Sequence, residues 1–258
     1  MITPKYFSRW QSIARVLSST LLVFLSLSPQ LFALEFPPAD DRGAPSRSAG
    51  GGTRGPSCID RGSLPLTALM PTRDNVGTTA TTNPTLFLYV PKNNAKSAEL
   101  VVVDDRGQEV YANKFPLTSS GGILKINVPH VASLQVGKNY VWQFALICDA
   151  EDRSQDRFVR GEIRPIELSS DLKQKLQQAS SPLEKAKLFA GAKIWNETLS
   201  IVADLRTTYP AEWQQLLKSV GLESLAEQPI FESFQADSSQ LILGNTRSAN
   251  AKNVILDR

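Results

Sequence analysis

The chain has 258 residues, with 28 Lys and Arg, 25 Asp and Glu, one His and two Cys, and 41% of its residues are hydrophobic. One His and two Cys are too few soft ligands for a zinc, haem or iron–sulfur site. The excess of basic residues lies entirely in residues 1–33, and acidic and basic residues are equal in number over the rest of the chain. This balance argues against nucleic acid as a partner.

Residues 1–33 have the order of a secretory signal peptide. Three basic residues precede an apolar run at residues 16–27, followed by Pro29 and by the small residue Ala33. The run is shorter than the about 20 residues that a membrane-spanning helix needs. We expect cleavage after Ala33, which leaves no membrane span; an uncleaved N-terminal anchor is the alternative. Either outcome places the folded part outside the cytoplasm, in the periplasm or the medium.

Export changes how the two cysteines are interpreted. In an oxidising compartment two cysteines are more often paired than free, which predicts a disulfide between Cys58 and Cys148. Two unpaired thiols are the alternative. The bridge would close a loop of about 90 residues and tie the preceding segment to the rest of the fold.

Residues 34–62 are rich in Gly, Pro, Ser and charged residues, which predicts a flexible leader. Gly50, Gly52 and Gly55 fit the G-x-G-x-x-G spacing of dinucleotide-binding loops. No strand precedes them, and Pro56 stands where the phosphate-binding helix would begin. We therefore expect no dinucleotide site.

Residues 63–168 predict an antiparallel β-sandwich of immunoglobulin or fibronectin-III-like architecture, because short apolar runs alternate with turn residues. A hairpin turn is expected at residues 105–107, Asp-Arg-Gly. In the best strand, Tyr140 and Trp142 begin a period-two buried stripe, and Tyr140 is placed to bond back to the preceding turn as a tyrosine corner. The expected strands are 64–70, 85–90, 98–104, 108–115, 122–128, 139–148 and 157–167.

Residues 169–230 predict a helical region. Ser169 or Ser170 caps a first helix, Ser181 and Pro182 begin a second, a third runs from about Trp195 to residue 208, and Pro210 begins a fourth that ends near Gly221. Two of these helices resemble a single tetratricopeptide-like hairpin. One hairpin cannot bury its own apolar face, so the helices should pack on each other or on the sandwich. Residues 231–258 predict a poorly ordered tail.

The segment from Cys148 to Arg157 holds the densest group of acidic residues. Oxygen ligands at this density could coordinate Ca²⁺, although the spacing is not that of a known calcium loop and Arg153 and Arg157 offer neutralisation. We favour a solvated loop with internal ion pairs, and keep the carboxylates as a candidate loop ligand cluster. Its members are Asp149, Glu151, Asp152 and Asp156.

No catalytic constellation is visible, so we expect no enzymatic activity and assign no catalytic residue, cofactor or metal site. His130 follows Pro129 at a strand end, where an exposed turn residue is expected, and no nucleophile elbow accompanies it. A pair of carboxylates for glycoside hydrolysis is not excluded. Asn196 begins an N-x-T pattern inside a helix, so we interpret that pattern as coincidence.

The aromatic residues admit two interpretations. Tyr89, Tyr111 and Trp142 could form a platform that stacks on sugars. Trp142 shares its alternation with Phe144 and Leu146, however, which favours a core position.

Several landmarks together resemble the cyanobacterial exported proteins grouped as domain of unknown function 928, over roughly residues 42–228. They include residues 51–56 before Cys58, the run 84–91, the Gly137-x-x-Tyr140-x-Trp142 pattern and residues 146–149. Ala150 replaces a common Pro after the Cys-Asp pair. The resemblance implies an extracytoplasmic protein and supplies no activity, ligand or catalytic residue.

These features lead to one expected function and one alternative. We expect an exported, non-enzymatic interaction or structural module of the cell envelope, whose partner is another envelope protein. The alternative is a module that binds polysaccharide or a small ligand through loops or aromatic residues. The oligomeric state has no signature in the sequence.

Overall fold

The computed structural model describes residues 34–37, 58–71, 76–117, 120–132 and 134–232. The predicted signal peptide, residues 38–57 of the predicted leader and residues 233–258 of the predicted tail lie outside the described residues. The described part is mainly β, with four α-helices in its C-terminal half.

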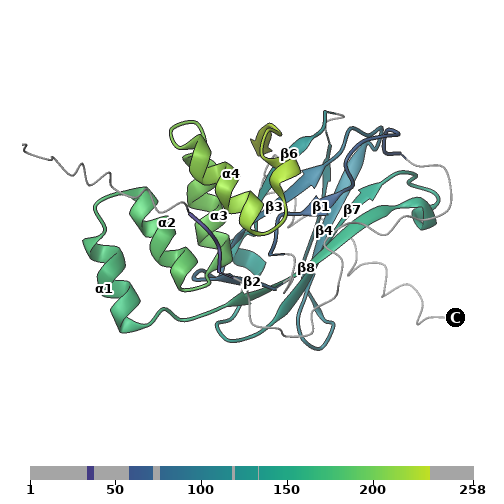
Figure 1. The fold of residues 1–258 in the computed structure, drawn as a ribbon. Coiled ribbons are helices and arrows are strands. Elements are labelled where there is room, and N and C mark those ends of the chain that lie inside the picture. Colours follow the sequence, from purple (N-terminus) through teal and green to yellow (C-terminus); the bar gives the residue numbers. More distant parts are fainter. Residues whose placement is uncertain (1–33, 38–57, 72–75, 118–119, 133, 233–258) are drawn as a thin grey trace, which may run out of the picture. The chain divides into compact units, whose positions relative to one another are not determined.

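The strands form two sheets that share one hydrophobic core (Figure 1). The four-stranded sheet has the order β1 (Thr67–Ala68), β3 (Thr85–Val90), β6 (Gly122–Asn127) and β9 (Ile230–Glu232). The five-stranded sheet has the order β2 (Val76–Thr79), β8 (Arg157–Pro165), β7 (Tyr140–Ile147), β4 (Ser97–Val103) and β5 (Glu109–Pro116).

The core between the sheets follows from the period-two alternation of the strands. On β7, Trp142 and Phe144 are fully buried, as their alternation predicts. On β3, Leu86 and Leu88 enter the same core from the opposite sheet. Burying large aromatic and aliphatic side chains from both sheets in one core supplies the main hydrophobic stabilisation of this half of the molecule.

The other face of β3 belongs to a second core, which the helices complete. Phe87 and Tyr89 point away from the first core and pack against the helical region. Figure 1 shows α3 and α4 beside β3 and β6, while α1 and α2 extend further from the sheets. The helices are α1 (Ser170–Gln178), α2 (Pro182–Gly191), α3 (Trp195–Asp204) and α4 (Pro210–Ser219).

The helices begin where their capping residues predict. The Ser169 hydroxyl accepts a hydrogen bond from the Leu172 amide, and the Ser181 hydroxyl accepts one from the Glu184 amide. Pro210 occupies the first turn of α4. No helix in the described ranges has the length and apolar character needed to cross a membrane.

The sheets are mixed, whereas the sequence predicts purely antiparallel pairing. β2 pairs in parallel with β8, and β9 pairs in parallel with β6. Neither parallel strand is predicted from the sequence, because β2 is only Val-Gly-Thr-Thr and β9 only Ile-Phe-Glu. Each is specified by its partner strand and not by a pattern of its own. The strand expected at 64–70 shrinks to Thr67–Ala68, flanked by Pro65 and Pro71.

Two predicted turns are confirmed. Between β4 and β5, the Asp104 side chain accepts hydrogen bonds from the amides of Arg106 and Gln108, and Gly107 has a φ of 76°. Before β7, the Gln135 amide donates to the Tyr140 hydroxyl at 2.9 Å. This bond is the one expected of a tyrosine corner.

Candidate functional site

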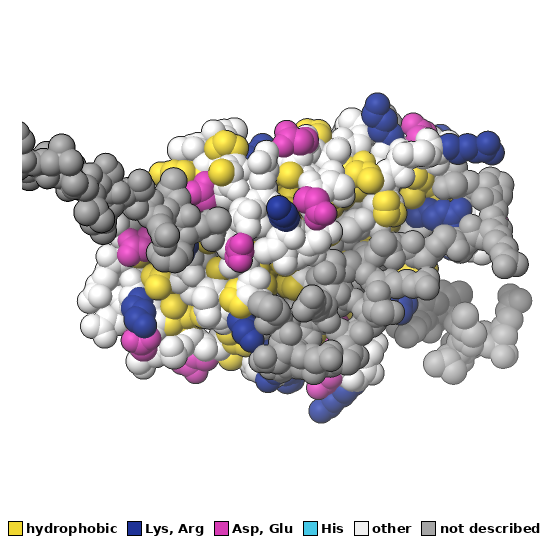
Figure 2. All heavy atoms as spheres, viewed as in Figure 1, with side chains coloured by type: hydrophobic (Ala, Val, Ile, Leu, Met, Phe, Trp, Pro, Cys, Tyr) yellow, Lys and Arg dark blue, Asp and Glu magenta, His cyan; other side chains and the backbone are white. Residues whose placement is uncertain are grey.

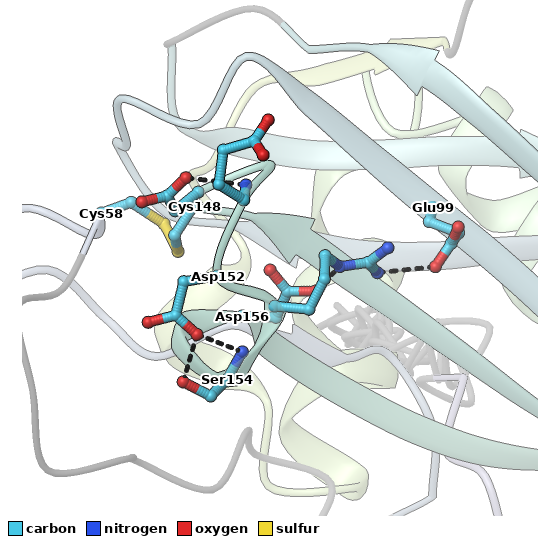
Figure 3. A network of polar contacts seen from close by, with 9 residues as sticks. Cys58, Glu99, Cys148, Asp152, Ser154 and Asp156 are labelled. Atoms are coloured by element: carbon cyan, nitrogen blue, oxygen red, sulfur yellow. Dashed lines mark hydrogen bonds and ion pairs between the residues drawn. A yellow bond between two sulfur atoms is a disulfide. The ribbon is translucent and has the colours of Figure 1, made fainter.

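The candidate loop cluster lies in the connection between β7 and β8, beside the disulfide (Figure 3). Cys58 and Cys148 are bonded, with their Cα atoms 5.3 Å apart, as the export argument predicts. The Cys58 carbonyl also accepts a hydrogen bond from the Asn94 amide, and Ile59 forms an isolated bridge with Asn93. The disulfide and these two contacts therefore fix residues 58–59 next to the end of β7.

The carboxylates at the tip of this loop accept hydrogen bonds from the loop itself. One oxygen of Asp149 accepts from the Glu151 amide at 2.9 Å. Asp152 accepts from the hydroxyl and amide of Ser154 and from the Gln155 side chain. The Ser154 hydroxyl contributes most to holding the pKa of Asp152 below its ordinary value.

A second set of charges ties the loop to the neighbouring strand. Arg153 donates to Asp156 at 2.5 Å and to Glu99 of β4 at 2.8 Å, and these bonds raise its pKa, the Glu99 bond most. Figure 3 labels the two acidic partners, Asp156 and Glu99. Asp156 is buried, and its other oxygen has no hydrogen-bond partner among the described residues.

The arrangement of Asp149, Glu151, Asp152 and Asp156 is that of a hydrogen-bonded turn. Nowhere in the described ranges do three His, Cys, Asp or Glu side chains come close enough together to hold a metal ion. Two of the four carboxylates already cap local backbone groups, and Asp156 is paired with Arg153.

The aromatic candidates do not form an exposed platform. Trp142 is 1% exposed and Tyr89 6% exposed, in the two different cores. Tyr111 is half-buried, and this burial raises the pKa of its hydroxyl. Tyr140 is buried as the corner residue. His130 is exposed in a short 3₁₀ turn after β6.

A polar junction that the sequence analysis did not predict lies at the start of α3. Its first three residues, Trp195, Asn196 and Glu197, each bond to the sheets. The Trp195 indole donates to the Leu69 carbonyl at 2.8 Å, and the Asn196 amide donates to the Thr85 carbonyl at 3.0 Å.

Glu197 is the ionisable member of this junction. One of its oxygens accepts from the Thr79 hydroxyl at 2.7 Å and from the Ala80 amide at 2.9 Å. Its other oxygen is buried without a partner among the described residues. Burial raises the pKa of Glu197, because desolvation disfavours the carboxylate more than these two bonds favour it.

A cavity of about 10 Å³ lies beside this junction, lined among others by Trp142, Glu162 and Asn196. The Trp142 indole nitrogen and the Asn196 carbonyl oxygen are both buried without a protein partner in the described part. The space suffices for about one water molecule, which could bond to such polar groups. It is too small for a substrate.

The N-x-T pattern at this junction lies on a side chain that is already used inside the fold. Asn196-Glu-Thr198 matches a glycosylation pattern, but Asn196 is 7% exposed and its side-chain nitrogen already donates to Thr85. Three consecutive residues, Trp-Asn-Glu, in a first helical turn could have indicated a docked helix end. Their partners are more than 100 residues away in the chain.

Comparison with known families decides the classification of this fold. The model of a family described as Domain of Unknown Function (DUF928) matches residues 49–230. The chain belongs to this family. The DUF928 region contains the disulfide, the loop cluster, all four helices and every strand except the last two residues of β9. No curated protein matches the chain.

Proposed function

We propose that this DUF928 protein is an exported, non-enzymatic interaction or structural module of the cell envelope. The observation that carries the proposal is that the chemically capable side chains are committed to internal contacts. Three of the four loop carboxylates, Asp149, Asp152 and Asp156, cap or pair within the loop, and the polar start of α3 is bonded to the sheets. The described part is in this view a disulfide-linked scaffold.

Two features support a location outside the cytoplasm. Residues 1–33 have the charge and apolar order of a signal peptide. The Cys58–Cys148 bridge is compatible with an oxidising compartment. We also propose that the envelope is that of a cyanobacterium. This part of the proposal is supported only by the family resemblance of the sequence.

The surface supports a protein partner more than a nucleic acid. On the face shown in Figure 2, described acidic and basic side chains are interspersed. Exposed large apolar side chains such as Val131 and Val136 are available for contact. The alternative, a polysaccharide or small-ligand module, would depend on loops alone, because Tyr89 and Trp142 are buried.

The finer architecture is also proposed. The tyrosine corner at Tyr140 supports an immunoglobulin or fibronectin-III-like sandwich, and the packing of α2 against α3 supports a tetratricopeptide-like hairpin. Both likenesses would place the protein among scaffolds that present surfaces to partners.

Intact-mass measurement of protein recovered outside the cytoplasm tests the proposed location. The expected mass lacks residues 1–33, and thiol labelling succeeds only after reduction. Recovery in the cytosol with both thiols reactive would overturn the proposal.

Photo-crosslinking in intact envelopes tests the proposed role. A crosslinking residue at Val131 or Val136 should give a discrete adduct with one envelope protein. The matched control places the same residue at exposed Tyr209, on the helical side. Adducts of identical pattern from all three positions would indicate random collision and contradict a specific interface.

A further inference from the structure

Residues 34–37 form a short segment that is buried in the helical core. Leu34 is 2% exposed and Phe36 is 6% exposed, whereas Glu35 between them is exposed. This alternation is typical of an extended peptide with one face bound. Figure 1 shows the segment in purple beside α3 and α4. We call residues 34–37 the N-terminal segment.

The segment is held by three kinds of contact, from α3 and α4. The Phe36 ring meets the Trp195 ring edge-on, with centroids 4.9 Å apart. The Phe36 amide donates to the Ser219 hydroxyl at 3.0 Å, and the Gln215 side chain donates to Glu35 at 2.7 Å. We call Trp195, Gln215 and Ser219 the docking site.

The docking site is oriented by the fold that carries it. The Ser219 hydroxyl donates its own proton to the Leu216 carbonyl at 2.7 Å, which leaves its oxygen free to accept from the segment. The Trp195 indole is fixed by its bond to Leu69. The segment thus has a buried aromatic anchor, Phe36, and meets a side-chain hydroxyl that is already oriented to accept its backbone amide. Buried aromatic anchors and pre-oriented partners are features that favour binding.

The segment and its site belong to different parts of the chain. The family match covers residues 49–230, which includes the docking site and excludes the segment. Between the segment and Cys58 lie residues 38–57, a stretch dominated by Gly, Pro, Ser and charge. No strand pairing involves residues 34–37. The segment is thus attached through side chains and one backbone bond.

We propose that the docking site is a peptide-recognition site for an extended apolar-acidic-Phe segment, and that residues 34–37 occupy it as a detachable ligand of the same chain. The inference does not depend on the proposed export. It predicts that the same peptide binds in trans when the resident segment is weakened.

The tether sets the expected affinity. A connection of about 20 residues gives an effective concentration in the millimolar range. For the segment to be docked in about nine-tenths of molecules, the free peptide must bind with a Kd of about 0.1 mM or tighter. The natural chain should then bind added peptide about tenfold more weakly than a chain whose own segment is defective.

The first experiment uses a fluorescent peptide with the sequence of residues 33–38, Ala-Leu-Glu-Phe-Pro-Pro, titrated into the full chain with the substitution Phe36→Ser. We expect saturable binding to this variant and about tenfold weaker binding to the natural chain. A control peptide with Ser in place of its Phe should bind about 100-fold more weakly, as expected for loss of a buried Phe. Equal binding to both chains, or equal binding of both peptides, would overturn the proposal.

A second experiment covers the case in which Phe36→Ser disturbs folding. A specific protease site is inserted after residue 45 of the otherwise natural chain. After cleavage, the N-terminal fragment should stay bound at protein concentrations above the Kd of the free peptide, leave on dilution below that Kd, and be displaced by the added peptide. A fragment that leaves at protein concentrations well above the Kd measured in the first experiment, from a domain with unchanged circular dichroism, would overturn the proposal. The proposal would also be overturned if the natural chain formed a dimer and Phe36→Ser converted it to a monomer. The docking site would then hold the N-terminal segment of a second copy.

Discussion

Glu197 gives the junction at the start of α3 a pH dependence. Because its pKa is raised, the folded chain keeps this proton to higher pH than the unfolded chain does. The free energy of unfolding therefore falls as the pH rises from about 4.5, the ordinary Glu value, through the raised pKa.

Glu197→Gln should remove this dependence. Gln keeps an acceptor for Thr79 and Ala80, so the variant should gain stability relative to the natural chain as the pH rises through that window. Urea unfolding at several pH values measures the difference. Glu184→Gln is the control with the opposite sign, because the Ser180 amide and hydroxyl lower the pKa of Glu184. A pH-independent difference for Glu197→Gln would contradict the assignment.

Gly77 on β2 lies so close to the start of α3 that there is no room for a side chain at this position. A Cβ atom at this position would lie 2.6 Å from the Asn196 side-chain oxygen. Gly77→Ala should therefore cost about 1–3 kcal/mol of unfolding free energy, the usual cost of overpacking. Gly191→Ala is the matched control, since a Cβ there meets nothing within 4 Å, and it should be neutral or slightly stabilising. Equal unfolding midpoints for the two variants would show that the junction can shift at no cost.

At the scale of elements, the corner before β7 joins the turn at Gln135 to the strand that places Trp142 and Phe144 in the core between the sheets. Tyr140→Phe removes the hydroxyl that accepts the Gln135 amide and leaves that amide without its partner. Because Gln135 is exposed and water can replace the lost hydroxyl, the expected loss is about 0.5–1.5 kcal/mol, the net contribution of a typical hydrogen bond. Thermal or urea unfolding measures it. Tyr209→Phe, at an exposed residue, is the control and should be nearly neutral.

The helices show which elements local sequence can specify. Ser169, Ser181 and Pro210 mark helix starts through bonds and dihedral preferences of their own neighbourhood, and the structure confirms them. The strands β2 and β9 show the opposite case, because parallel pairing depends on residues far along the chain. The polar junction at Trp195–Glu197 could not be predicted for the same reason, because its partners lie far along the chain, on β2, on β3 and just after β1.

At the scale of the whole molecule, the disulfide joins residues separated by 90 positions. The chain-entropy model assigns such a loop roughly 4 kcal/mol of stabilisation. The double variant Cys58→Ser, Cys148→Ser should lose up to this amount in urea unfolding. Reduction of the natural chain should reproduce the loss, which serves as the control. Identical unfolding curves for oxidised and reduced protein would contradict this stabilisation. They would mean that the contacts of Cys58 and Ile59 with residues 93–94 suffice, without the disulfide, to hold residues 58–59 in place.

The sequence by itself determined the β-rich class, most strand positions, the helix caps, the tyrosine corner and the pairing of the two cysteines. Each of these depends on alternation, capping chemistry or composition, which act over a few residues or, for the cysteines, on there being only two. Only the tertiary structure decided that the helices cover the outer face of β3, that Asn196 is a buried donor, and that Leu34 and Phe36 leave the predicted leader to enter the helical core. These outcomes depend on which distant surfaces meet, because the hydrophobic effect rewards burial without specifying the partner.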